Sequence, residues 1–188
     1  MSIVNKKKLY LCQFSIIVEK QFVLLPYSVA SVWAYAKQDN IVNHNYDLSA
    51  DIFFIKKPIE QMMSEIKDPD VFALSTYTWN SNYSDTLAKK VKEVYPNCLI
   101  VYGGPQVPDN DADLFVKKPW IDICVHQEGE FAFKEILIQN LQDKNWDSID
   151  GISYNIDTKL IRTTKSKRIR NLDEIPSPYM EGIFDGYV

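Results

Sequence analysis

The chain alternates short, almost continuously apolar runs with stretches in which apolar residues recur every three or four positions. Consecutive apolar residues dominate the runs KLYLCQFSIIV, DVFALSTY, NCLIVYGG and WIDICVHQ, a pattern typical of strands covered on both faces. In contrast, YSDTLAKKVKEVYP carries Leu87, Val91 and Val94 on one helical face. Strands that alternate with helices through short connections form βαβ units. The sequence therefore predicts a doubly wound, mainly parallel sheet.

The predicted fold is α/β, with a five-stranded Rossmann-like (flavodoxin-like) sheet in residues 1–150 and a β-hairpin with an extended connector in residues 151–188. The five strands are expected at Lys8–Val18, Ala50–Lys57, Asp70–Tyr77, Asn97–Gly104 and Trp120–Gln127. The helices are expected at Tyr27–Gln38, with Ser28 as N-cap, and at Ile59–Asp68, Tyr83–Pro96, Asp111–Pro119 and Gly129–Asp143. The hairpin is expected at Gly151–Arg162, turning at Asp157–Lys159.

Composition excludes several classes of protein. The 188 residues are 46% hydrophobic and carry a net charge of −4, which suits one globular domain and argues against nucleic-acid binding. No apolar run reaches the ~20 residues that span a bilayer, so no membrane partner is expected. The three cysteines lie far apart in apolar runs, which matches no zinc or iron–sulfur spacing and indicates buried thiols in a cytoplasmic protein. His126, at a strand end, is interpreted as a hydrogen-bonded structural residue, and no metal ligands are predicted.

Three loops at the carboxyl ends of the predicted strands have unusual composition, and ligands of open parallel sheets bind at these ends. STYTWN offers hydroxyls and aromatic faces, GGP offers an exposed backbone, and QEGE places a glycine between two acids at a helix start. The candidate binding residues are Ser75, Thr76, Tyr77, Trp79, Gly103, Gly104, Pro105, Gln127, Glu128, Gly129 and Glu130. Structural interpretations remain open, namely a helix-capping loop, a tight corner and acids that complement the helix dipole.

Motifs for known catalytic chemistry are missing. The first strand–helix turn has no GxGxxG, no GK[ST] follows the glycine pair, and no nucleophile elbow is present. The residues therefore indicate a binding module more clearly than a catalyst, and no catalytic residue is predicted.

The order of the motifs resembles the N-terminal cobalamin-binding region of cobalamin-dependent radical S-adenosylmethionine (SAM) enzymes, which include methyltransferases and the anaerobic magnesium-protoporphyrin ester cyclase. The matching segments are Asp70–Ser75, Lys89–Lys92, Gly103–Pro105, Asp122–Glu130, Gly151–Tyr154 and Leu172–Pro178. The resemblance implies that Gly103 and Gly104 line the groove for the nucleotide tail of cobalamin. It also implies that residues 75–79 frame this groove and the corrin edge, and that QEGE closes its far side.

Two departures from the family pattern shape these expectations. Gln127 stands where the family has the first glycine of GEGE. The first strand–helix connection lacks the histidine loop of the cobalamin mutases, so the resemblance implies cobalamin binding without a histidine axial ligand.

The cluster-binding CxxxCxxC motif does not occur in residues 1–188, although the family places it shortly after the connector. The iron–sulfur cluster, SAM and a catalytic radical SAM barrel are therefore expected outside this chain, with the barrel as its partner in the same polypeptide. A free-standing domain is the other option. The competing functions are a flavodoxin-like ligand-sensing or protein-interaction module and a small nucleotide-dependent transferase.

Overall fold

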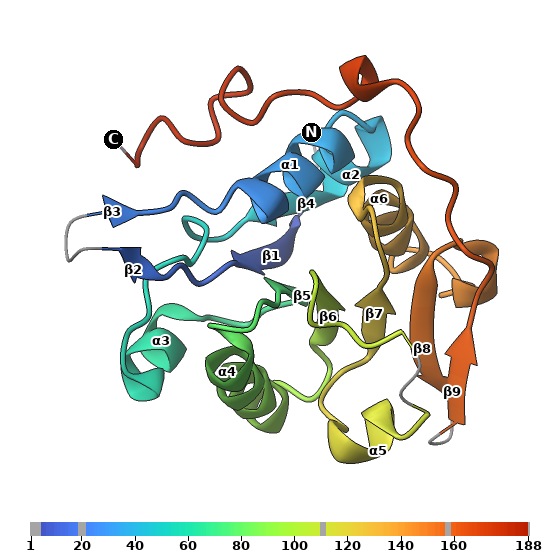
Figure 1. Ribbon diagram of the computed structural model, residues 1–188, viewed down its shortest axis with the longest axis horizontal. Helices are drawn as coiled ribbons and strands as arrows, with labels where there is room; N and C mark the ends of the chain where they lie inside the picture. The colour runs from blue at the N-terminus through green and yellow to red at the C-terminus, as the bar shows by residue number, and fades with distance from the viewer. Residues whose placement is uncertain (1–4, 19–21, 110–111, 157–158, 188) are drawn as a thin grey trace.

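The computed structural model describes residues 5–18, 22–109, 112–156 and 159–187. Within them, a seven-stranded sheet forms the centre of the molecule (Figure 1). In spatial order its strands are β4 (Tyr46–Leu48), β1 (Lys7–Cys12), β5 (Val71–Ser75), β6 (Leu99–Gly103), β7 (Ile123–Val125), β8 (Ile152–Ile156) and β9 (Lys159–Arg162). The first five strands are parallel to one another, and β8 pairs antiparallel with both β7 and β9. This arrangement confirms the predicted α/β class and the mainly parallel sheet, with seven strands in the sheet instead of the predicted five.

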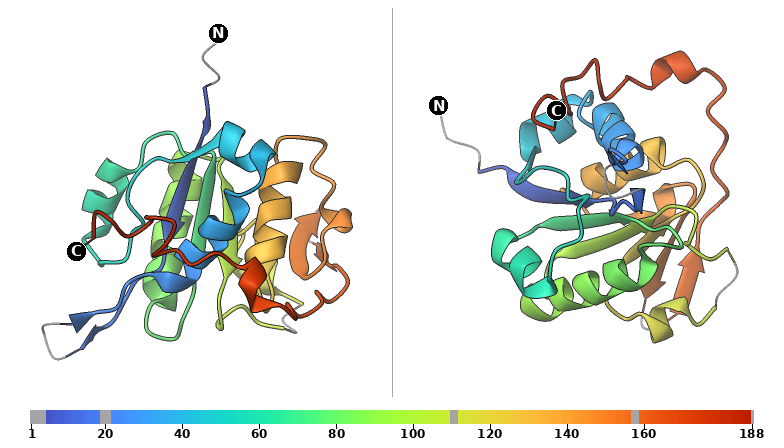
Figure 2. Two further views of the ribbon diagram at one scale, coloured as in Figure 1. Left: turned by 90° about the horizontal axis from the view of Figure 1, so that it is seen from above. Right: turned by 60° about the vertical axis from the view of Figure 1, so that its left-hand side comes forward.

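Helices cover both faces of the sheet, as Figures 1 and 2 show. One face carries α1 (Tyr27–Ala36), α2 (Asn40–Asn45) and α6 (Glu130–Gln139), and the other carries α3 (Ile59–Glu65), α4 (Ser81–Val94) and α5 (Leu114–Lys117). Two 3₁₀ turns, η1 (Trp146–Ser148) and η2 (Leu172–Glu174), lie near the hairpin and in the C-terminal segment. The strands β2 (Ile17–Val18) and β3 (Phe22–Val23) form a separate hairpin that projects from the body (Figure 2).

The apolar runs are continuous because alternate residues enter two different cores. In β5, Val71 and Ala73 pack with α1 and α6, whereas Phe72 and Leu74 pack with α3 and α4. Each of these four side chains is at most 6% exposed. Side chains of a strand alternate between faces, so a strand covered on both sides is apolar at every position.

The prediction of a second strand at Ala50–Lys57 is wrong. The edge of the sheet is instead β4, which pairs with β1, while the 50–57 segment contributes only an isolated bridge between Phe53 and Cys12. The unpredicted helix α2 precedes β4, and Asp39 caps it by accepting hydrogen bonds from the backbone of Ile41 and Val42. The apolar residues Ile52 and Phe53 are buried, but in loop conformation.

Two smaller expectations need correction, and a third is confirmed. The first strand ends at Cys12 rather than Val18, and the chain beyond it enters the β2–β3 hairpin. Ser28 is not the N-cap of α1, because the helix already begins at Tyr27 after Pro26. The predicted hairpin is confirmed as β8–β9 and joins the main sheet, although part of its turn, like Asn110, Asp111 and the Glu19–Gln21 loop, lies outside the described residues.

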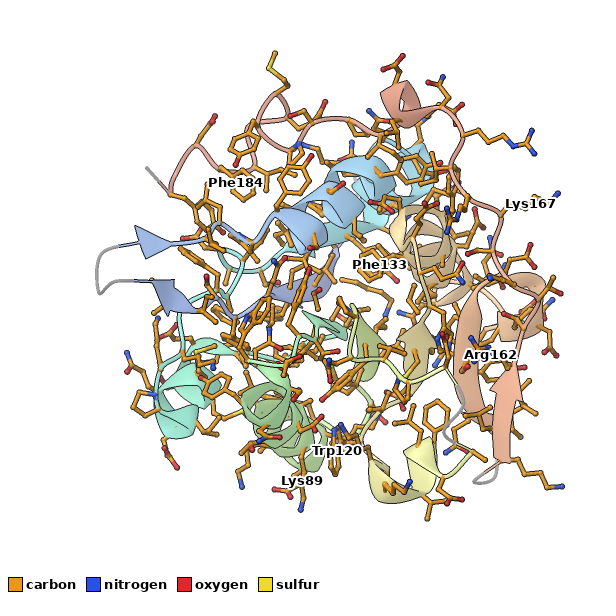
Figure 3. The ribbon with its side chains drawn as sticks, viewed as in Figure 1. Lys89, Trp120, Phe133, Arg162, Lys167 and Phe184 are labelled. Carbon is orange, nitrogen blue, oxygen red and sulfur yellow. The ribbon has the colours of Figure 1, made fainter. Side chains whose placement is uncertain are left out.

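The C-terminal segment after β9 runs back across α1 (Figure 1). Phe184 is 3% exposed in the core on the α1 side (Figure 3), and Lys37 Nζ lies 3.2 Å from a carboxylate oxygen of Glu181. The hydroxyl of Tyr187 accepts a hydrogen bond from the backbone N–H of Ile52. The connector is therefore packed on the domain. In the described part of the chain, no helix combines the length and apolar character needed to cross a membrane.

Candidate ligand-binding cavity

A cavity of about 570 Å³ opens at the carboxyl ends of β1, β5, β6 and β7. The chain leaves β1 toward α1 on one face of the sheet and leaves β5 toward α4 on the other, so the strand order reverses beside the cavity. This is where doubly wound sheets bind their ligands, and the volume suits one small-molecule group. Phe133 of α6 contributes to the apolar wall (Figure 3).

Nine of the eleven residues singled out from the sequence line this cavity. They are Ser75, Tyr77, Gly103, Gly104, Pro105, Gln127, Glu128, Gly129 and Glu130. Thr76 and Trp79 do not line it. Three loops that are far apart in the sequence thus meet at one site because parallel strands end at the same edge of the sheet.

The two adjacent glycines occupy different environments. Gly103 ends β6 on the same face as Val101, which also lines the cavity, and a Cβ at Gly103 would have no atom closer than 4.0 Å. Gly104 has φ +92°, and its Cβ would lie 2.7 Å from both the backbone N and the backbone O of Thr76. Gly104 is therefore required by the corner of the chain, whereas the missing Cβ of Gly103 leaves space in the cavity.

Thr76 joins the loops after β5 and β6. Its backbone N–H and its hydroxyl both donate to the carbonyl oxygen of Gly103, at 2.8 and 2.9 Å, and its own carbonyl accepts from the Gln106 N–H at 3.1 Å. With 3% exposure, Thr76 holds the Gly103–Gly104 backbone in place rather than facing the cavity.

An aromatic pair extends from Tyr77, which lines the cavity, to Trp79, which does not. The rings of Tyr77 and Trp79 stack with centroids 4.6 Å apart and planes 15° from parallel. The hydroxyl of Tyr77 lies 2.8 Å from Ser28 Oγ on α1, and Trp79 Nε1 donates to the carbonyl of Phe14 at 3.1 Å. Buried Asn80 supports the loop by accepting from the Tyr77 N–H at 2.8 Å. One face of the 44% exposed Trp79 therefore remains available on a rigid support.

The acids of QEGE are engaged with protein groups. Glu128 accepts a hydrogen bond from the backbone N–H of Ile169 at 2.7 Å, and Glu130, in the first turn of α6, accepts from Ser31 Oγ at 3.3 Å. Gly129 is the N-cap residue, and its Cβ would meet Val32 at an ordinary 3.5 Å. The two carboxylates thus tie the site to α1 and to the C-terminal segment.

Gln127 adopts φ +64°, a left-handed conformation that favours glycine. Gln127→Gly is expected to raise the free energy of unfolding by about 1 kcal/mol, because glycine relieves this strain. Urea denaturation measures the change, and Gln127→Ala, which keeps the strain, serves as the control with a stability near that of the wild type. Equal stability of the glycine and alanine variants would contradict the expectation.

Sequence reasoning missed the cavity residues of α1 and underestimated His126. Tyr27, Ser28 and Ser31 bring the start of α1 to the site. The spacing of the two serines, three apart on one face of an otherwise apolar helix, was the available signal. Asp109, also missed, lines the cavity from the loop after β6.

His126 is 5% exposed at the end of β7. Its Nε2 lies 2.7 Å from Ser153 Oγ on β8, which bears out a hydrogen-bonded residue, but Nδ1 has no hydrogen-bond partner among the residues that the structure describes. Asp109 Oδ1 lies 3.6 Å from Nδ1. The order Ser153–His126–Asp109 resembles a catalytic triad, yet Ser153 is 1% exposed and cannot reach a substrate. No group of three potential metal ligands occurs among the described side chains.

Burial lowers the pKa of His126 to about 4, with Arg162 acting in the same direction and Asp109 opposing it. The unfolded chain takes up the proton near pH 6.5, so this contribution to stability is present above that pH and is lost as the pH falls toward 4. Between pH 7.5 and 4, the wild type is expected to lose roughly 2–3 kcal/mol more unfolding free energy than His126→Asn. Denaturant titrations across this range test the difference, and parallel pH profiles would contradict it.

Comparisons with known proteins identify the family of the domain. The B12 binding domain model matches residues 16–137, more than half of the chain, so the chain belongs to the B12-binding domain family. This confirms the resemblance found in the sequence and identifies the domain type of cobalamin-dependent radical SAM enzymes.

Among individual relatives, the chain is 39% identical over 169 residues to the cobalamin-dependent radical SAM methyltransferase TokK of Streptomyces tokunonensis, covering 89% of this chain and 25% of that protein. It is also 39% identical over 165 residues to 2-(S-pantetheinyl)-carbapenam-3-carboxylate methyltransferase of Streptantibioticus cattleyicolor, covering 87% and 24%. The chain thus spans about a quarter of the length of these relatives.

Solved structures share the fold. The radical enzyme OxsB, with aqua-cobalamin and S-adenosylmethionine bound, superimposes with a TM-score of 0.72 at 15% identity, covering 98% of this chain and 26% of that one. The radical methyltransferase TsrM from Kitasatospora setae, with cobalamin and a [4Fe-4S] cluster bound, gives 0.62 at 12% identity, covering 92% and 31%.

Proposed function

We propose that this chain binds cobalamin with the nucleotide tail in the cavity between β5, β6, β7 and the start of α1, as the N-terminal domain of a radical SAM methyltransferase or cyclase-like enzyme. The observation that carries the proposal is the open space at Gly103, where a side chain would project into the cavity. Bound cobalamin would supply a cobalt centre for methyl transfer or for control of substrate access. The iron–sulfur cluster, SAM and the reaction of the intact enzyme belong to the proposed partner domain.

The residues at the site fit the roles of binding and orientation. The backbone of Gly103 would lie against the nucleotide tail, while Gly104 and Thr76 hold the corner in shape. The exposed Tyr77–Trp79 stack would lie against the corrin and exclude water from its lower face. Glu128 and Glu130, which are already hydrogen-bonded, would position the loop rather than contact the cofactor.

The proposed mode has no histidine below the cobalt. Residues 13–26, which connect β1 to α1, contain no histidine. His44 lies in the last turn of α2, directly before β4, and therefore at the opposite end of the parallel strands from the cavity. The ring of His126 is buried and attached to Ser153. These positions support a lower face closed by side chains or water.

Titration of the purified chain with hydroxocobalamin, followed by absorbance and calorimetry, tests the proposal. Saturable one-to-one binding is expected, and cobinamide, which lacks the nucleotide tail, is expected to bind far more weakly. Electron paramagnetic resonance of the bound cob(II)alamin is expected to show no splitting from a coordinating protein nitrogen. A folded chain that does not bind cobalamin but binds flavin mononucleotide would instead support a flavodoxin-like ligand-sensing module.

A further inference from the structure

We infer that His126 recognises the nucleotide tail of the ligand through Nδ1, which donates a hydrogen bond to an uncharged acceptor on the base or the ribose. The inference rests on the proposed function and adds a specificity residue to that site. It starts from the unpartnered nitrogen, since buried polar atoms in folded proteins are almost always hydrogen-bonded. His126 is 5% exposed and is one of the residues that line the cavity.

The surroundings of the ring assign the proton to Nδ1. The carboxylate of Asp109 is the nearby charged group on that side, and a carboxylate favours an N–H over a nitrogen lone pair. Nε2 is then the acceptor for the hydroxyl of Ser153, 2.7 Å away. The backbone N–H of His126 donates to the carbonyl of Gly151 at 2.8 Å, so both the ring and the main chain are held by the segment around β8.

Asp109 does not form a hydrogen bond with Nδ1, because Arg162 binds Asp109 and keeps its carboxylate away from the ring. Arg162 on β9 (Figure 3) donates to the side-chain Oδ1 of Asp109 at 2.9 Å and also to its backbone carbonyl. The same Oδ1 atom remains 3.6 Å from His126 Nδ1, beyond good hydrogen-bond distance. Asp109 and Glu128 both line the cavity, and the Asp109 carboxylate beside the ring disfavours an anionic acceptor at Nδ1, which argues for an uncharged one.

Two substitutions of His126 separate the roles of the two ring nitrogens. The amide of His126→Asn places polar atoms near the position of Nδ1, whereas the longer His126→Gln reaches the position of Nε2 and the contact with Ser153. We expect His126→Gln to weaken cobalamin binding by about 10- to 100-fold, because it leaves the ligand acceptor unpaired. His126→Asn is expected to stay within about 3-fold of the wild type. Both variants are expected to bind cobinamide as the wild type does.

Nuclear magnetic resonance tests direct contact with the ligand, because a purely structural role of His126 would leave its ¹⁵N signals unchanged on binding. The chain has two histidines, so the ¹⁵N signals of His126 can be followed beside those of His44 at the far end of the sheet. Binding of hydroxocobalamin is expected to shift the Nδ1 signal of His126 and to leave His44 unchanged. Denaturant unfolding of each variant establishes that it is folded.

The outcomes distinguish this inference from the proposed function. Saturable cobalamin binding with equal affinity in wild type and folded His126→Gln would overturn the role of His126 and leave the cofactor assignment standing. An Nδ1 signal that does not move on saturation would do the same. Absence of cobalamin binding by the folded wild-type chain would overturn both.

Discussion

Gly103→Val is expected to weaken cobalamin binding by at least about 100-fold while leaving the chain folded. The added side chain would extend into the cavity on the same face as Val101, where no atom lies within 4.0 Å of the Cβ position. Valine is well tolerated in a strand, and Gly103 does not occupy the left-handed region, so the backbone needs no adjustment. Calorimetric titration with hydroxocobalamin measures the loss, and urea denaturation measures stability.

Gly186→Val is the matched control for this change. Gly186 also has open space around its Cβ position but lies in the C-terminal segment, away from the cavity. The control is expected to bind cobalamin as the wild type does. Unchanged affinity of folded Gly103→Val would show that the nucleotide tail does not occupy the cavity beside β6.

Gly104→Ala is expected to lower the free energy of unfolding by at least about 3 kcal/mol. The Cβ would lie 2.7 Å from two backbone atoms of Thr76, and φ +92° is unfavourable for any L-residue. Thr76 cannot move aside easily, because its N–H and hydroxyl both bind the carbonyl of Gly103. Equilibrium urea denaturation gives the value.

Gly103→Ala, one residue away, is the control for the stability experiment. It adds the same methyl group in open space and is expected to change the unfolding free energy by less than about 1 kcal/mol. Equal losses in the two alanine variants would contradict the division of roles between the glycines. The pair therefore separates a glycine required by the fold from one required by the cavity.

Sequence periodicity predicted the central strands but not the edge strand β4. The strands β5, β6 and β7 are short and almost continuously apolar, and this local property follows directly from coverage on both faces. The edge strand β4 has three residues, of which only Tyr46 is buried, so no apolar run marks it. The apolar residues Ile52 and Phe53 predicted a strand, yet they are buried as a loop beside the C-terminal segment.

The residues that line the cavity were predicted where they lie on strand ends and were missed elsewhere. STYTWN, GGP and QEGE carry chemistry that is visible in three short segments, and the strand-end rule brings them together. The start of α1 and Asp109 reach the cavity through helix packing and loop closure. Arg162 joins the site through an ion pair with a residue 53 positions away, which no local pattern reveals.

The α/β class, the parallel strands and the three loops that surround the cavity follow from local sequence patterns, because hydrophobic periodicity and turn residues act over a few neighbouring positions. The separate roles of the two glycines, Gly104 in the corner of the chain and Gly103 beside the cavity, depend on long-range packing. Both glycines are the same in the sequence, and the difference depends on the backbone of Thr76, brought beside them by strand pairing. The environment of His126 is likewise a tertiary property, since the pairing of β7, β8 and β9 brings Ser153 to Nε2 and places Arg162 where it binds Asp109.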